Sequence, residues 1–201
     1  MSSEPDREPT LWEQKLAVEP GHSAWYVKRF RRLAADGVDI VGEARTVDAM
    51  LDRRSRVLDA GCGPGRVGGH LHTVGHAVVG IDIDPVLIEV AEHDHPGPTW
   101  LVGDLSTLDL EARGIPEPFD AIVCAGNVLP FAAPSSRSEI LLMPKSSVIS
   151  CSEGSLSPIL SLPWEMSSMI WFMTSVWMSG AFSIRDRPGN FIFLSMFLPR
   201  G

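Results

Sequence analysis

The sequence predicts an α/β fold with a mainly parallel sheet, and two observations lead to this prediction. Short apolar runs alternate with helix-like segments between residues 56 and 126. A glycine-rich turn, AGCGPG, follows the first of these runs and precedes a helix. Strands that are apolar throughout and alternate with helices are typical of a parallel sheet covered on both faces. The 201 residues suffice for one such domain with a core of its own.

An arm and two helices are expected before the first strand. The first dozen residues are polar and acidic, which indicates a loose arm. Residues 23–36 carry apolar side chains at helical spacing, and Ser23 and Gly37 are suited to begin and end that helix. A second helix is expected over residues 38–51, and its inward side chains are Val41, Ala44, Val47 and Leu51.

Four strands and two helices are expected in the central part of the chain. The strands are RVLDAG at 56–61, HAVVGID at 76–82, TWLVGDL at 99–105 and FDAIVCAG at 119–126. The helices cover residues 66–74 and 84–94. Two glycines weaken the first of them. Asp84 and Pro85 supply the N-cap and the first residue of the second.

The composition changes abruptly near residue 133. Residues 1–133 hold 33 charged residues and 5 serines, whereas residues 134–201 hold 9 charged residues and 16 serines. Three interpretations of this tail stay open: an unusual substrate-binding region, a membrane span over the 19 uncharged residues 166–184, or a reading frame that shifts near Ser135. We favour the frame shift, because it explains a change in many residue types at once.

Charge and cysteine content disfavour several classes of protein. A net charge of −8 disfavours nucleic-acid binding, which requires basic surfaces. The three cysteines, Cys62, Cys124 and Cys151, form no CxxC pair, which disfavours a disulfide framework or a zinc site and favours the cytoplasm. A secretory signal peptide has a basic region followed by an apolar region, and the N-terminal residues show neither, so a secretory signal is not expected.

The glycine-rich turn indicates a ligand site at the start of a helix. Glycines permit positive φ and let a ligand approach the backbone, and a helix N-terminus attracts anionic groups. The dinucleotide-binding pattern G-x-G-x-x-G would need a glycine at position 66, where the chain has Arg66. An acidic side chain, Asp59, stands two residues before Gly61. Such a carboxylate suits a cationic ligand better than a pyrophosphate.

These motifs resemble those of class I S-adenosylmethionine-dependent methyltransferases. LDAGCGPGR resembles the first motif of that family, an acidic residue followed by G-x-G-x-G. VVGIDID, VGDL and FDAIVCAGNVL resemble its later motifs, in the same order. The resemblance covers about residues 20–133 and implies a Rossmann-like, three-layer α/β/α sandwich.

The resemblance also implies S-adenosylmethionine as cofactor and a role for each motif. Asp59 and the glycine turn would serve its cationic methionine part, Asp82 the ribose hydroxyls, and Asp104 the adenine amino group. Ile83 and Leu105 would flank the adenine ring. The predicted cofactor-binding residues are Asp59, Gly61, Cys62, Gly63, Gly65, Asp82, Ile83, Asp104, Leu105 and Ala125. No catalytic residue and no metal ligand is predicted.

The chain departs from the family pattern after residue 133. The family continues with a glycine-containing turn, a fifth strand and an antiparallel hairpin, whereas the turn in LLMPKSSVIS contains no glycine. We therefore divide the chain into an N-terminal arm with helices (1–55), a cofactor-binding core (56–133) and an atypical Ser/Met-rich segment (134–201). Whether the sheet is complete at its C-terminal end stays open.

The predicted function is methyl transfer from S-adenosylmethionine to a small-molecule acceptor. One alternative is a truncated or frame-disrupted relic without activity. The other is an NAD-dependent oxidoreductase, which Arg66 and Asp59 disfavour. A nucleic-acid partner is not expected, and a membrane partner is disfavoured. The sequence identifies neither the acceptor nor the oligomeric state.

Overall fold

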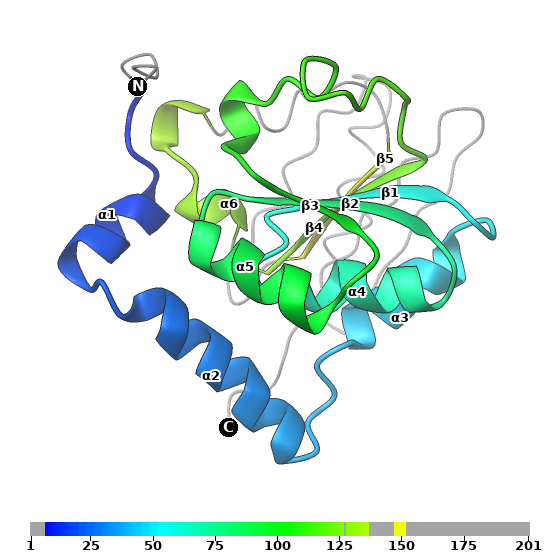
Figure 1. Cartoon of the computed structure of the whole chain (residues 1–201), viewed down its shortest axis with the longest axis horizontal. Helices are drawn as coiled ribbons and strands as arrows, with labels where there is room; N and C mark the ends of the chain where they lie inside the picture. Colours follow the sequence, from blue (N-terminus) through cyan, green and yellow to red (C-terminus); the bar gives the residue numbers. More distant parts are fainter. Residues whose placement is uncertain (1–6, 127, 137–146, 152–201) are drawn as a thin grey trace, which may run out of the picture.

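Five parallel strands form a single sheet at the centre of the protein (Figure 1). The computed structural model describes residues 7–126, 128–136 and 147–151. The strand order is β3-β2-β1-β4-β5, and every neighbouring pair is parallel. The strands are β1 (Arg56–Ala60), β2 (Ala77–Asp82), β3 (Thr99–Val102), β4 (Ala121–Ala125) and β5 (Ser147–Cys151). The predicted Rossmann-like α/β class is confirmed.

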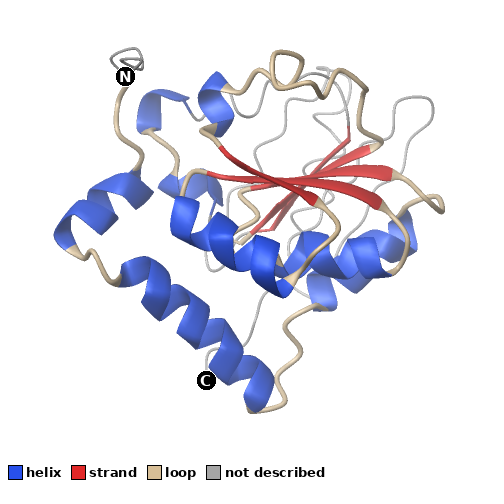
Figure 2. Cartoon of the chain, viewed as in Figure 1, coloured by secondary structure: helices blue, strands red, loops and turns tan. Residues whose placement is uncertain are grey.

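Helices α3 (Gly42–Met50), α4 (Arg66–Thr73) and α5 (Pro85–Asp94) cover one face of the sheet (Figure 2). Strand side chains alternate between faces, so Val57 of β1 points toward these helices and Leu58 points away. Val57 packs with Val47 and Leu71 in a core that is closed to solvent. The helices over 38–51, 66–74 and 84–94 therefore exist where predicted, with ends that differ by a few residues.

The opposite face is covered by the segment between β3 and β4 and by α6 (Val128–Phe131). That segment contains the 3-10 turn η1 (Leu105–Thr107), and a second such turn, η2 (Pro134–Ser136), follows α6. Leu58, Ile81 and Ile122 of the strands pack there against Leu105 and Phe119. The sheet is thus covered on both faces, which explains why its strands are apolar throughout.

The sheet continues beyond the four strands that the sequence predicts with clarity. β5 pairs with β4 over five residues, from Ala121 and Ser147 to Ala125 and Cys151. The segment LLMPKSSVIS therefore ends in a fifth parallel strand despite its lack of glycine. The 166–184 interval and most of the 134–201 segment lie outside the described residues. Within the described part of the chain, no helix has the length and apolar character that a membrane crossing needs.

The N-terminal part of the chain contains a helix that was not predicted, α1 (Leu11–Val18). It begins at the end of the first dozen residues, for which a loose arm was expected. Its start is a capping box: the Thr10 hydroxyl accepts a hydrogen bond from the Glu13 amide, and the Glu13 carboxylate accepts one from the Thr10 amide. The spacing T-x-x-E was visible in the sequence. It was missed because α1 has little apolar periodicity.

Helix α2 (His22–Ala35) lies where it was predicted, but Ser23 does not cap it. Gly21 occupies the N-cap position, and the Ser23 hydroxyl donates instead to Asp84 Oδ2 at 2.5 Å. The prediction for Ser23 was wrong because a buried carboxylate on another element outcompetes the local backbone. Gly37 follows the end of the helix with φ 78°, as predicted for a terminating glycine.

Candidate functional site

A cavity opens at the carboxyl ends of β1, β2, β3 and β4. It encloses about 990 Å³ of space, open solvent at its mouth included. Ligands of open α/β sheets bind at this edge, next to the point where the strand order reverses. Here that point lies between β1 and β4, because the order runs from β1 to β3 on one side and from β4 to β5 on the other. The cavity is therefore the candidate site.

The glycine turn forms the floor of the cavity. Gly61, Gly63 and Gly65 all have positive φ, at 74°, 55° and 80°. Gly61 and Gly63 line the cavity, whereas Gly65 faces Ala91 and Trp100 and begins α4. A Cβ on Gly61 would lie 2.4 Å from a methyl group of Val128. The turn needs glycine both for its backbone conformation and for space.

The amide groups of this turn are engaged within the protein. The N–H groups of Gly61 and Cys62 both donate to the Ile81 carbonyl oxygen, and that of Gly65 donates to the Cys62 carbonyl. The Gly63 N–H donates to Asp82 Oδ2 at 2.8 Å. A pyrophosphate cradle presents such groups to its ligand. In this turn the N–H groups bond to the protein itself and are not presented to a ligand. This agrees with the sequence, which lacks the G-x-G-x-x-G pattern of dinucleotide-binding turns.

Asp82 stands at the end of β2 and points into the cavity. Its two carboxylate oxygens accept hydrogen bonds from the amides of Gly63 and Asp84, at 2.8 and 2.9 Å. Burial raises the pKa of Asp82 to about 6. The carboxylate is ionised at neutral pH and keeps lone pairs for further hydrogen-bond donors.

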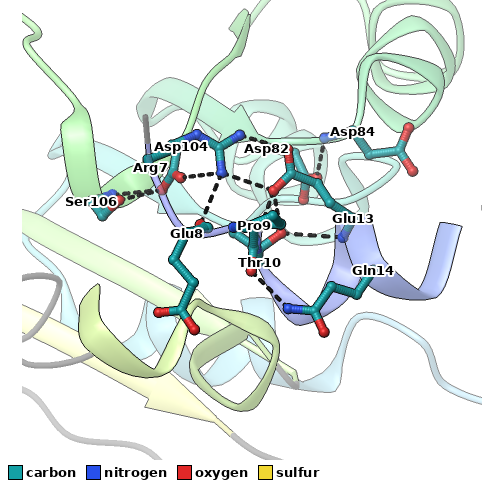
Figure 3. A network of polar contacts seen from close by, with 10 residues as sticks. All are labelled: Arg7, Glu8, Pro9, Thr10, Glu13, Gln14, Asp82, Asp84, Asp104 and Ser106. Carbon is teal, nitrogen blue, oxygen red and sulfur yellow. Dashed lines mark hydrogen bonds and ion pairs between the residues drawn. The ribbon is translucent and has the colours of Figure 1, made fainter. Parts of the chain in front are cut away.

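Asp104 follows β3 and lies along the same edge (Figure 3). Its Oδ1 accepts hydrogen bonds from the backbone amide and the hydroxyl of Ser106, each at 2.8 Å. Its Oδ2 lies 3.2 Å from the Arg7 guanidinium. Ile83, Leu105 and Ala125 also line the cavity. The structure thus brings together seven of the ten predicted residues, from four different strand ends.

Asp59, Cys62 and Gly65 are the three predicted residues outside the cavity lining. Asp59 is only 1% exposed, and its Oδ2 accepts a hydrogen bond from the Gly68 amide of α4 at 2.8 Å. Cys62 packs against Ile88, Ala91 and Trp100, and burial raises the pKa of its thiol well above the usual range. These side chains hold the turn against the helices behind it, and Cys62 is not activated as a nucleophile.

The ionisation of Asp59 provides a test of its burial. Burial raises its pKa to about 7, above the value of about 3.9 in an unfolded chain. The folded state therefore binds this proton more tightly, and the contribution of Asp59 to stability falls as pH rises from about 4 to about 7. We expect the free energy of unfolding of Asp59→Asn, relative to wild type, to increase by roughly 1–3 kcal/mol over that range.

Urea unfolding at several pH values measures this difference. Taking the difference between the two proteins removes the contributions of groups that do not interact with Asp59, such as Glu13, whose lowered pKa acts in the opposite direction. Asp82 interacts with Asp59 electrostatically, so the difference reports Asp59 together with this interaction. A difference between variant and wild type that stays constant across this pH range would show that the Asp59 carboxyl has an ordinary pKa.

The N-terminal helices form a wall of the cavity that was not predicted. Trp12 of α1 and Tyr26, Arg29 and Phe30 of α2 line the cavity there. Arg66 lines it as well, pairs with Glu43 and donates to the Ile40 carbonyl at 2.7 Å. No local motif marks these residues. Across the described residues, no group of three or more His, Cys, Asp or Glu side chains is arranged to hold a metal ion.

Known proteins resemble this chain in sequence and in fold. The family model described as a methyltransferase domain matches residues 57–142. A solved structure of a TehB-like SAM-dependent methyltransferase from Corynebacterium glutamicum is 34% identical, with a TM-score of 0.60, and the match covers 87% of this chain and 97% of the other. The protein belongs to the S-adenosylmethionine-dependent methyltransferases. This confirms the predicted family and enzyme class and decides against an NAD-dependent oxidoreductase.

Two further solved structures overlap with this methyltransferase less closely. Magnesium protoporphyrin IX methyltransferase from Synechocystis, with bound SAM, is 23% identical, covers 69% of this chain and 71% of its own, and has a TM-score of 0.46. A SAM-bound amino pentose methyltransferase from Micromonospora echinaspora is 26% identical, covers 60% and 48%, and has a TM-score of 0.43. A search of curated proteins gave no match.

Proposed function

We propose that this methyltransferase transfers a methyl group from S-adenosylmethionine to a small-molecule acceptor, and that the cavity at the carboxyl edge of the sheet is where it does so. One observation carries the proposal: the glycine turn and the two carboxylates of Asp82 and Asp104 line a single cavity. The two carboxylates offer acceptors to the hydroxyl and amino groups of a ligand, and the glycines leave space beside them.

The lining residues fit the parts of this cofactor. Asp82 keeps lone pairs for the two ribose hydroxyls, and Asp104 accepts from the adenine amino group. Ile83 and Leu105 offer apolar surface to the adenine ring, and Gly61, Gly63 and Ala125 leave room for the methionine part. Asp59, Cys62 and Gly65 keep a role in this proposal through the backbone of the turn that they support.

The residues of this chain act on the reaction by position. When bound, S-adenosylmethionine supplies a methyl group on a sulfonium, which is already a good leaving group. The cofactor would be held at the floor of the cavity by Asp82, Asp104 and the glycine turn, which fixes the position of its methyl group. Water would be kept away from that methyl group by the aromatic side chains of Trp12, Tyr26 and Phe30. Alignment of donor and acceptor can contribute about 7–11 kcal/mol to lowering the barrier. No general base is assigned among the described residues.

A small acceptor in the cytoplasm completes the proposal. The aromatic side chains that line the cavity support a small acceptor that enters it. The isolated cysteines of the sequence support a reducing compartment. We also propose that the chain divides after residues 55 and 133. The middle unit, residues 56–133, carries the glycine turn, both carboxylates and the apolar residues assigned to the cofactor.

Titration calorimetry with the full chain tests the proposed cofactor. We expect S-adenosylhomocysteine, the product form, to bind with micromolar affinity, and NADH to give no heat of binding. A thermal-shift assay with both ligands provides an independent readout, since a ligand that binds the folded state raises its melting temperature. Binding of NADH alone would contradict the proposal. A cooperatively folded chain that binds neither ligand would favour the inactive relic.

A further inference from the structure

The segment from Arg7 to Val18, which we call the N-terminal strap, contacts the adenosine end of the cavity (Figure 3). The Arg7 guanidinium donates to both carboxylate oxygens of Glu13, at 2.8 and 2.5 Å, and lies 3.2 Å from Asp104 Oδ2. One cation therefore joins two carboxylates, one on the strap and one at the end of β3. The Arg7 and Asp104 side chains are only 23% and 10% exposed.

A second set of contacts joins the strap to Asp82. The Trp12 indole N–H donates to Asp84 Oδ2 at 2.9 Å, and the Asp84 amide donates to Asp82 Oδ1 at 2.9 Å. The strap is thus connected to both of the carboxylates that the proposed function assigns to adenosine. It reaches Asp104 directly and Asp82 through one intervening residue.

The far side of the cavity provides a third attachment. The Ser135 hydroxyl donates to Glu8 Oε2 at 2.6 Å. Trp12 meets Phe131 of α6 edge to face, with ring centroids 5.4 Å apart. Because Thr10 and Trp12 line the cavity, the strap forms one of its walls and makes contacts both at the end of β3 and at α6.

We propose that Arg7 is a positioning residue of the cofactor site, which holds the Asp104 carboxylate toward the adenine amino group and fastens the strap across the adenosine end. The inference rests on the proposed function, since it takes Asp104 as the acceptor for that amino group. Arg7 itself need not touch the cofactor.

The geometry explains why an arginine serves this purpose. A carboxylate can accept about four hydrogen bonds, so Asp104 can bind Ser106, Arg7 and an amino group together. The guanidinium fork binds both oxygens of Glu13, and one nitrogen of that fork, Nη1, also lies 3.2 Å from Asp104 Oδ2. Lysine lacks such a fork, so it cannot make the paired contact with Glu13 and the contact with Asp104 in the same geometry. Glu13 is ionised at neutral pH and can therefore bind Arg7 as a carboxylate, because the Arg7 guanidinium lowers the pKa of that carboxyl to about 2.

Calorimetry on Arg7 variants of the full chain, with two ligands, tests this role. The ligands are S-adenosylhomocysteine and S-inosylhomocysteine, whose base carries an oxygen in place of the amino group. We expect Arg7→Ala to weaken S-adenosylhomocysteine binding about tenfold, because the Asp104 carboxylate would lose its orientation and with it much of its charge-assisted hydrogen bond to the adenine amino group. Binding of the inosyl ligand should change much less, so selectivity for the amino group falls. Arg7→Lys should lie between Arg7→Ala and wild type.

Arg53→Ala is the matched control, because Arg53 forms an exposed ion pair with Asp48 away from the cavity. It should leave both affinities unchanged. Equal affinities in Arg7→Ala and wild type would overturn the inference, and so would an equal loss for both ligands, which indicates a merely structural role. If wild type binds neither ligand, the proposed function fails, and the inference fails with it.

Discussion

Asp82→Ala is expected to weaken S-adenosylhomocysteine binding at least about 100-fold. Asp82 points into the cavity from the end of β2 and organises its floor, because its carboxylate accepts from the amides of Gly63 and Asp84. Alanine removes the acceptor for two ribose hydroxyls and leaves both amides without it. Each hydrogen bond to a charged group contributes about 1.5–3 kcal/mol, so the loss of two suffices for this effect.

Asp82→Asn separates the two parts of this effect. Asparagine keeps the size of the side chain and one oxygen acceptor, so the turn is better preserved, and we expect a loss of about tenfold. Asp36→Ala is the control, since Asp36 is an exposed carboxylate at the end of α2. Calorimetry gives the affinities, and thermal melting of each variant checks its folding. Unchanged affinity in Asp82→Ala would remove Asp82 from the site.

The central part of the fold follows from local sequence signals. Parallel strands buried on both faces need apolar residues at every position, and this produces the runs around Val57, Val79 and Ile122. Helix α5 was marked by Asp84 and Pro85, and the structure places Asp84 at its N-cap, accepting from the Val86 amide at 2.9 Å. The glycine turn and the acidic residues Asp82 and Asp104 could also be predicted from the sequence. Each of them lies at or just after the end of a strand that the apolar runs mark.

The remaining features depend on contacts between distant parts of the chain. Asp84 was predicted as a cap, yet it also accepts from Trp12 and Ser23, which lie 72 and 61 residues away. Arg7 bonds to Glu13 six residues on, but its pairing with Asp104 comes from the tertiary fold. Spacing in the sequence carries no information about such pairs. The position of Asp59 behind the turn, instead of in the cavity, likewise became visible only once α4 was in place.

The glycines of the helix that begins after the turn show the same dependence. They lower helix propensity, and the sequence offers no reason for them. In the structure the Trp100 ring lies between α4 and β2, fixed by a hydrogen bond from its N–H to the His95 carbonyl at 2.9 Å. A Cβ on Gly68 would lie 3.0 Å from this ring, and a Cβ on Gly69 would lie 2.5 Å from the His95 ring. The two glycines therefore make room for the side chains of Trp100 and His95, which pack behind the glycine turn.

Gly80→Ala is expected to have the largest effect on stability, because Gly80 of β2 lies directly against that ring. An added Cβ would lie 2.1 Å from Trp100 Cζ3 and 2.2 Å from Cε3, and 3.2 Å from Cys62 Sγ. The ring cannot turn away freely, since it is buried and hydrogen-bonded. Overpacking a core costs about 1–3 kcal/mol and occasionally more. We expect a loss of at least about 3 kcal/mol in the free energy of unfolding, measured by urea titration.

A double-mutant cycle with Trp100→Leu locates the cause of that loss. Leucine vacates the space over Gly80, so adding Gly80→Ala to Trp100→Leu should cost less than about 1 kcal/mol, although Trp100→Leu is itself destabilising. Gly21→Ala is the control, since a Cβ there meets no atom within 4 Å and the position carries no positive φ. Because alanine is a poorer N-cap than glycine, Gly21→Ala should lower stability by about 1 kcal/mol or less, well below the loss expected for Gly80→Ala. Equal costs of Gly80→Ala with and without the tryptophan would mean that the strand backbone, and not the ring, requires this glycine.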